Sequence, residues 1–413
     1  MSLIKNTFWN LSGYIIPSLI AIPSLGYLAR HLGPEKFGLF TLATALVGYA
    51  SIFDAGLTRA VIREISFYRD DSQEVKKIVS NSTVILTMLG FLGGGCIYFG
   101  AGNIVSFLNV KEALRVETKT AIEILGITLP LFLLNQAWLG ILEGYEKFKK
   151  INFIKTFNSS FIVGLPAFFV FFNNSLVYAV IGLLTARLLS IIITFVACKH
   201  HILKSGLRLD YGTATRLLKY GGWITVSNII SPLMAYLDRF FISNTLGAAH
   251  VAFYTAPSEG VQRLSIFPGA LSRAVFPKLS SLSAKNEKNK QKKLAYLLMA
   301  GAIFPLCLIG FLFSEEIMVT WMGTEFSGLP SLILKILIIG YFFNCIAQIP
   351  FADIQASGKS KTTAMLHLCE VLPYFALLFM LVNFYGIIGA AFAWSIRTTI
   401  DCLLLVWLNN KVR

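Results

Sequence analysis

The segment FDAGLTRAVIREIS at residues 53–66 reappears as FPGALSRAVFPKLS at residues 267–280, which is 214 positions later in the chain. The two segments share a Phe, a Leu and an Arg-Ala-Val triplet in one register. At the same offset, Trp9 matches Trp223. Rare residues that match in one gapless register indicate that the chain consists of two related halves, as in many transporters.

Each half carries apolar runs that are long enough to cross a bilayer. The 413-residue chain is 55% hydrophobic and only 14% charged, whereas soluble domains carry roughly 25% charged residues. A lipid-embedded backbone must satisfy its own hydrogen bonds, which makes such runs helical. The sequence therefore predicts an all-α membrane protein of about twelve transmembrane helices. The predicted spans are 8–30, 37–66, 78–107, 117–142, 150–173, 176–200, 214–246, 251–280, 294–313, 329–356, 361–384 and 387–410.

The repeat divides these spans into two lobes. Six spans per half is an even number, so both halves enter and leave on the same side and are related by a pseudo-twofold axis along the membrane normal. The predicted domains are an N-terminal six-helix lobe, 1–205, and a C-terminal six-helix lobe, 206–413. Two like bundles that face one another are typical of alternating access.

The net charge of +15 is a topology signal. Lysine and arginine gather in the even-numbered loops, for example at 285–293, and at both chain ends, whereas the odd-numbered loops hold few. The positive-inside rule then places both termini and all even loops in the cytoplasm of a multi-pass bacterial inner-membrane protein. The basic patches are attracted to anionic headgroups of the lipid bilayer, and we expect no nucleic acid partner.

Charged residues inside the predicted spans identify a candidate binding site, because such residues are costly in lipid unless they face a cavity or a partner. Cations outnumber carboxylates, which favours an anionic substrate, and arginine suits bidentate phosphate binding. A drug exporter for lipophilic cations would show the opposite sign. The candidate substrate-binding residues are Arg59, Arg187, Arg239, Arg263, Arg273, Arg397 and Lys335.

Structural roles compete with binding at several of these positions. Arg59 and Arg273 lie near a membrane interface and could snorkel. Arg263 could pair with Glu259, and Arg397 with Asp401, because each pair is four residues apart on a helix. Asp238 and Arg239 together favour a structural or gating role. Position alone makes Arg187, Lys335 and Arg397 candidates.

The carboxylates within the spans are candidates either for coupling to a proton or sodium gradient or for pairing with arginine. They are Asp54, Asp238, Glu259, Glu370 and Asp401. We expect no cofactor and no metal: the six cysteines lie singly in apolar stretches, and His31, His250 and His367 stand alone in the sequence.

Three segments carry a resemblance to a known family. They are LGYLARHLGPEKFGLFTLATALVGYASIFDAGL at 25–57, YGGWITVSNIISPLMAYLDRFFISNTLG at 220–247 and VAFYTAPSEGVQRLSIFPGALSRAVFPKLS at 251–280. They resemble the polysaccharide transporter family, the Wzx-type O-antigen flippases. The L-G-P-E-x-F-G turn and the F-Y-T-A-P-x-x-x-V-x-R motif are specific, and the likeness extends in order over essentially the whole chain.

The resemblance implies the V-shaped, two-lobed fold of multidrug and toxic-compound exporters and lipid II flippases. It also implies a function in lipopolysaccharide biosynthesis, in which O-antigen repeat units on undecaprenyl pyrophosphate move from the cytoplasmic to the periplasmic leaflet. An O-antigen polymerase and a chain-length regulator are then candidate partners. Among the arginines, Arg59, Arg239, Arg263 and Arg273 fall in the matched segments, and Arg59 and Arg273 would receive the pyrophosphate from both lobes.

Other functions remain as alternatives. A related exporter could carry an exopolysaccharide, teichoic acid, lipid II or a drug. A membrane glycan polymerase or a glycosyltransferase would need a long periplasmic loop or a cytoplasmic D-x-D segment. The sequence has neither, since Asp70-Asp71 lacks that spacing. The sequence therefore predicts a transporter and not an enzyme.

Overall fold

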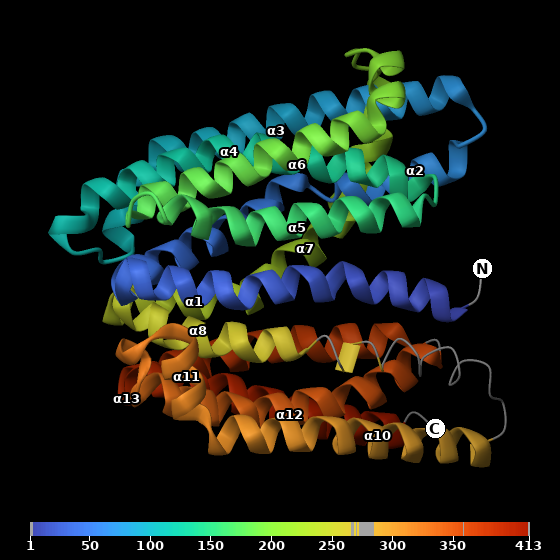
Figure 1. The fold of residues 1–413 in the computed structure, drawn as a ribbon. Helices are drawn as coiled ribbons and strands as arrows, with labels where there is room; N and C mark the ends of the chain where they lie inside the picture. The colour runs from blue at the N-terminus through green and yellow to red at the C-terminus, as the bar shows by residue number, and fades with distance from the viewer. Residues whose placement is uncertain (1–2, 266–267, 270, 272–284, 358, 412–413) are drawn as a thin grey trace. The chain divides into compact units, whose positions relative to one another are not determined.

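The computed structural model describes residues 3–265, 268–269, 271, 285–357 and 359–411, and these are almost entirely helical (Figure 1). The first elements are α1 (Leu3–Ala50), η1 (Ser51–Asp54), α2 (Leu57–Tyr68), α3 (Ser72–Phe107), α4 (Glu112–Gly144), α5 (Phe148–Val170), α6 (Leu176–Ser205), α7 (Tyr211–Leu246) and α8 (Ala248–Leu264). The later elements are α10 (Lys285–Leu312), α11 (Ser314–Met322), η2 (Thr324–Phe326), α12 (Leu329–Ala356) and α13 (Ser360–Lys411).

Many of these helices can span a membrane. Among the described residues, eight helical segments are long and apolar enough to do so. Most of them overlap predicted spans: α5 overlaps the span predicted at 150–173, and α12 matches the span at 329–356. The span predicted at 214–246 is helical, as α7, but it is not one of the eight segments. The predicted span at 251–280 begins in α8, but much of it lies outside the described residues. The chain is therefore an all-α, multi-pass membrane protein.

Two of the long helices each join two predicted spans, whole or in part, across a glycine. The backbone of α1 departs from helical geometry at Gly33, with φ 72° and ψ 167°, and α13 does so at Gly386, with φ 59° and ψ −142°. Positive φ suits glycine, which has no Cβ. Each glycine marks the turn that the sequence predicts between consecutive spans.

The predicted continuous span at 37–66 is wrong, because the structure breaks it at residues 51–56. Helix α1 ends at Ala50, and after η1 the chain passes through Ala55 and Gly56, both with positive φ, before α2 begins. The Asp54 carboxylate accepts hydrogen bonds from the backbone N–H and the hydroxyl of Thr58. A carboxylate that caps the next helix stabilises the break.

The chain forms two compact units, Met1–Ala249 and His250–Arg413. Helix α7 packs against α1, α2 and α3 and belongs to the first unit. The division into lobes at 205/206 follows the internal repeat and stays a prediction. In the second unit, α12 packs along α13 and α10.

Glycines allow the closest helix crossings. A Cβ on Gly126 of α4 would lie 2.6 Å from the carbonyl oxygen of Gly94 on α3, and one on Gly94 would overlap the carbonyl oxygen of Gly126. In α12, a Cβ on Gly340 would lie 2.6 Å from the hydroxyl oxygen of Ser395 on α13. Small residues at such crossings let backbones approach, and van der Waals packing then holds the helices together.

Adjacent glycines in α3 test this packing. We expect Gly94→Ala to destabilise the protein by about 1–3 kcal/mol, because the new methyl group forces α3 and α4 apart. Gly95→Ala is the matched control, since a Cβ there meets nothing within 4 Å. The measurement is the thermal midpoint of each variant purified in one detergent. Equal midpoints for the two variants would contradict the close crossing.

Candidate substrate-translocation site

Four ionisable side chains meet within the α13 hairpin. His367 and Glu370 precede the turn at Gly386, and Arg397 and Asp401 follow it. The Nδ1 atom of His367 lies 3.7 Å from Glu370 Oε2 and 3.8 Å from Asp401 Oδ1. Arg397 Nε lies 3.8 Å from the same Glu370 oxygen. The two carboxylates are 8% and 7% exposed, so the hairpin buries two acids beside one arginine.

This α13 cluster, defined as His367, Glu370, Arg397 and Asp401, corrects two expectations. His367 does not stand alone: its ring nitrogen and oxygens of Glu370 and Asp401 all lie within 4.8 Å of one another. Arg397 approaches Glu370 across the hairpin, and no ion pair joins it to Asp401. Chemically, the cluster can exchange a proton or accept a small cation, because two acids and an imidazole share one partly dehydrated space.

A buried ion pair joins α10 to α12. Lys292 Nζ lies 2.7 Å from Asp353 Oδ2, and the two side chains are 6% and 3% exposed. The sequence assigns Lys292 to a basic loop, because it lies in a run of lysines. The structure instead buries it in α10, a helix that can cross a membrane. A buried carboxylate needs such a partner.

Two predicted cations contact aromatic rings. The Arg187 guanidinium carbon in α6 lies 4.6 Å from the centre of the Phe132 ring, and Lys335 Nζ in α12 lies 5.8 Å from that of Phe311. Cation–π contacts stabilise such groups only in part. Neither cation forms an ion pair with a described residue, so both retain charge that a ligand could neutralise.

The remaining predicted cations differ in their surroundings. In α8, Arg263 pairs with Glu259 at 3.1 Å, as the four-residue spacing predicts. In α7, the carboxylate of Asp238 accepts the N–H of Arg239, whose guanidinium carbon lies 5.3 Å from the Tyr236 ring centre. Asp238 and Arg239 are both buried, which suits a structural or gating role.

The two arginines of the repeated segment are only partly described. Arg59 is exposed on α2, opposite the face that carries Leu57, Ala60 and Val61. It forms no ion pair within the described part of the chain. Arg273 lies outside the described residues. Their joint role therefore stays a prediction.

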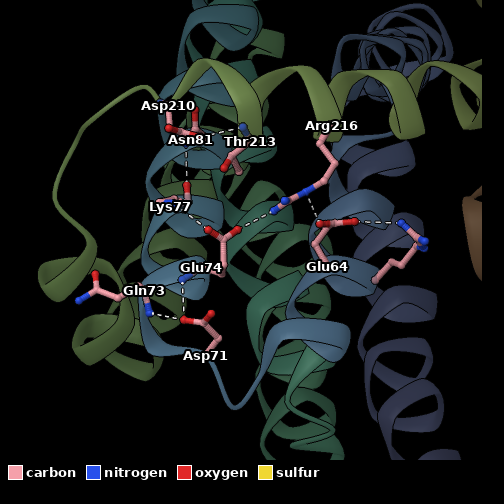
Figure 2. A network of polar contacts seen from close by, with 10 residues as sticks. Glu64, Asp71, Gln73, Glu74, Lys77, Asn81, Asp210, Thr213 and Arg216 are labelled. Carbon is pink, nitrogen blue, oxygen red and sulfur yellow. Dashed lines mark hydrogen bonds and ion pairs between the residues drawn. The ribbon is translucent and has the colours of Figure 1, made fainter.

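A polar network at one end of the first unit was missed by sequence reasoning. Figure 2 shows Arg216 of α7 reaching between two carboxylates: its Nε lies 2.6 Å from Glu64 of α2, and its Nη2 lies 3.0 Å from Glu74 of α3. Lys77 adds a 2.7 Å ion pair to Glu74, and Arg63 a 2.9 Å pair to Glu64. Ion pairs thus connect α2, α3 and α7.

Helix caps extend this network along the chain. Asp71 accepts the N–H groups of Gln73 and Glu74 at the start of α3, and Asp210 accepts that of Thr213 at the start of α7 (Figure 2). The hydrogen bonds from Thr213 lower the pKa of Asp210, so this cap persists at neutral pH and is lost as pH falls through that lowered pKa. The cap pattern was visible in the sequence; the pairing with Glu64 was not.

Glu64→Ala tests the network. We expect the free energy of unfolding to fall by about 1–2 kcal/mol, because a buried carboxylate loses two ion pairs. The loss is not larger, because Arg63 and Arg216 are partly exposed to solvent, which screens their charges. The control is Glu112→Ala, which removes a surface partner of Arg115 and should cost under about 0.5 kcal/mol. The measurement is the thermal midpoint of both variants under the same conditions. A Glu64 variant as stable as the control would show that the ion pairs of Glu64 contribute little to stability.

The comparisons with known proteins identify the family. A model of the polysaccharide biosynthesis protein family matches residues 3–283, well over half of the chain. The chain belongs to this family. A Shigella flexneri family relative named "Putative O-antigen transporter" is 48% identical over 412 residues, which cover 100% of this chain and 99% of the relative.

Solved structures show which fold this family member has. The lipid II flippase MurJ in an inward closed conformation aligns with a TM-score of 0.75 at 16% identity, covering 96% of this chain and 86% of that one. An inward-facing multidrug resistance MATE transporter aligns with a TM-score of 0.73 at 13% identity, covering 97% and 94%. The chain therefore has the MATE-like transporter fold that the resemblance implies.

Proposed function

We propose that this member of the polysaccharide biosynthesis protein family is a flippase for lipid-linked glycans. The observation that carries the proposal is the 48% identity to the Shigella flexneri protein, whose printed name is an O-antigen transporter, from end to end of both chains. Matches over 92% of the chain to a Haloferax volcanii protein named as a probable glycan biosynthesis flippase support the same class.

The cargo that we propose is an O-antigen repeat unit on undecaprenyl pyrophosphate, moved from the cytoplasmic to the periplasmic leaflet by alternating access. The support is electrostatic. Arg187 and Lys335 lack ion pairs within the described residues, and among these residues Glu370 is the one carboxylate within ion-pair distance of Arg397. A pyrophosphate is the strongest anion on such a cargo, and arginine binds it bidentately. Arg59, Arg239, Arg263 and Arg273 remain further candidates.

The membrane in question is the bacterial inner membrane, with both termini in the cytoplasm. The distribution of lysine and arginine supports this orientation. The O-antigen polymerase and the chain-length regulator then act on the product at the periplasmic face and are the partners to seek.

Energy for transport comes, in this proposal, from a proton or sodium gradient acting on the α13 cluster. Glu370 and Asp401 are two of the five carboxylates that the sequence offers as candidates for coupling or charge pairing, and the geometry adds His367. Protonation or cation binding would change the charge that faces Arg397, and so alter the hairpin that holds it. Asp54 is less suited, since it caps α2 through Thr58.

A deletion strain tests the function. Loss of the gene is expected to remove surface O-antigen and to leave carrier-linked repeat units on the cytoplasmic face. The intact gene should restore surface O-antigen and clear the accumulated repeat units. Single repeat units added to the lipid A core, without polymer, would indicate a polymerase instead. Unlinked or altered repeat units would indicate a glycosyltransferase. Normal O-antigen in the deletion strain would contradict the proposal.

A further inference from the structure

Helices α5 and α6 pack in a register that two contacts define. A Cβ on Gly182 of α6 would lie 2.6 Å from the carbonyl oxygen of Leu165 on α5. Toward the other end, Lys150 Nζ donates to the carbonyl oxygen of Ala197 at 2.8 Å. The helices are consecutive and antiparallel, so a residue that follows Lys150 lies level with one that precedes Ala197 by the same number.

This register brings unsatisfied polar groups close to one level. Ser160 of α5 lies level with Arg187 of α6, and Asn158 lies within one residue of the level of Ser190. Asn158 is 5% exposed and Ser190 is 0% exposed. Both polar atoms of the Asn158 side chain, the two serine hydroxyls and Nε of Arg187 are buried without a hydrogen-bond partner. Buried polar groups are satisfied in the great majority of cases, so a group of them requires an explanation.

The same level is the middle of the membrane-crossing helix. Arg187 follows the first residue of α6, Leu176, by 11 positions, which is about 16 Å along the axis of a hydrocarbon layer about 30 Å thick. Its guanidinium rests on the Phe132 ring, and no carboxylate pairs with it in the described part of the chain. A cation in this position is costly unless something neutralises it.

One turn beyond Ser190, and two turns beyond Arg187, the polar groups of α6 have hydrogen-bond partners. Thr194 donates to the side-chain oxygen of Asn135 on α4 at 2.6 Å. Buried polar side chains of the first unit thus have partners at one level of α6 and lack them at the level of Arg187. The groups without a partner include three donors, which are Nε of Arg187, the amide nitrogen of Asn158 and the hydroxyl of Ser190. Donors at the level of a positive charge are the chemistry that binds an anionic oxygen group.

We infer that Arg187, Asn158 and Ser190 form a binding site inside the first unit for an anionic oxygen group of the cargo. The inference rests on the proposed function and adds two uncharged residues to it. Arg187 supplies the positive charge, and the Asn158 amide and the Ser190 hydroxyl supply directional hydrogen bonds. Because such bonds depend on where the oxygen atoms lie, Asn158 discriminates between anions of different geometry. The group is either the pyrophosphate of the carrier or the carboxylate of an acidic sugar.

Asn158→Leu and Arg187→Leu test the site, with Thr194→Val as the control. Leucine has the branching of asparagine without its polar atoms, and in place of Arg187 it removes a buried charge. Both site variants should therefore melt no lower than the parent, whereas Thr194→Val breaks a satisfied hydrogen bond and should melt lower. Ligand binding should reverse this order. We expect the site variants to bind roughly tenfold more weakly or worse, since each lost charge-assisted bond is worth at least that factor, and Thr194→Val to bind like the parent.

Binding is measured as the shift of thermal midpoint in nanodiscs with two probes, undecaprenyl pyrophosphate and glucuronic acid. A shift with the first identifies the pyrophosphate, and a shift with the second identifies a sugar carboxylate; either one, if lost in both site variants, supports the site. The site is disproved if both variants bind the probes and move carrier-linked oligosaccharide like the parent. Water alone would then occupy the space between these polar groups. A parent protein that moves no such cargo would instead refute the proposed function.

Discussion

Lys292→Met is expected to destabilise the second unit by about 3–5 kcal/mol, because it removes the buried cation that lies against the buried Asp353 carboxylate. The pair is 2.7 Å long, and both side chains are almost fully enclosed. A loss of this size should be visible as a large fall in the yield of monodisperse protein and in the thermal midpoint.

Two further variants isolate the cause. Lys293→Met removes the neighbouring lysine, which is exposed, and should leave stability within about 0.5 kcal/mol of the parent. Adding Asp353→Asn to Lys292→Met removes the stranded charge and should recover most of the loss, since two neutral partners need no counter-ion. If the double variant is no more stable than Lys292→Met, the loss comes from packing and not from charge.

Asp401→Asn is expected to uncouple transport from its driving gradient. Neutralising this carboxylate leaves His367 and Glu370 as one acid and one imidazole beside Arg397, a set that can balance its charge without taking up a further cation. We expect gradient-driven transport in proteoliposomes to fall by at least about tenfold, the scale for one lost charge-assisted contact. Downhill exchange should continue.

Separate pH and sodium gradients identify the coupling ion, and Glu316→Gln is the control because that carboxylate is exposed in the same unit. A variant at Asp401 that keeps the full response to either gradient would refute the role of the α13 cluster. A parent protein that responds to neither gradient would refute ion coupling as a whole.

The sequence could predict the helices because their signals are local. Apolar runs gave the spans, and the Leu-Gly pair at Gly33 and the Tyr-Gly pair at Gly386 marked turns that the structure contains. The break at Ala55 and Gly56 was missed, because the apolar residues that flank it look continuous. Its signal is the Asp-Ala-Gly run followed by Thr58, which is a cap placed inside a hydrophobic stretch.

The site residues depend on contacts between helices, which local patterns do not specify. His367 and Asp401 are 34 residues apart and meet only because the α13 hairpin has one particular register. Asn158 looked like an ordinary polar residue of an apolar helix, and its interest comes from the lack of a partner in a buried position. In both cases the residue types were visible in the sequence, but their neighbours were not.

The central claim is that this chain moves lipid-linked oligosaccharide between leaflets, and reconstitution tests it most directly. Purified protein is placed in vesicles that carry undecaprenyl-pyrophosphate-linked repeat units, and a glycosidase that cannot cross the membrane reports which leaflet holds them. We predict that the protected fraction becomes accessible with the parent protein and a gradient, and remains protected with Arg187→Leu. Equal protection in vesicles with and without the parent protein would contradict the claim.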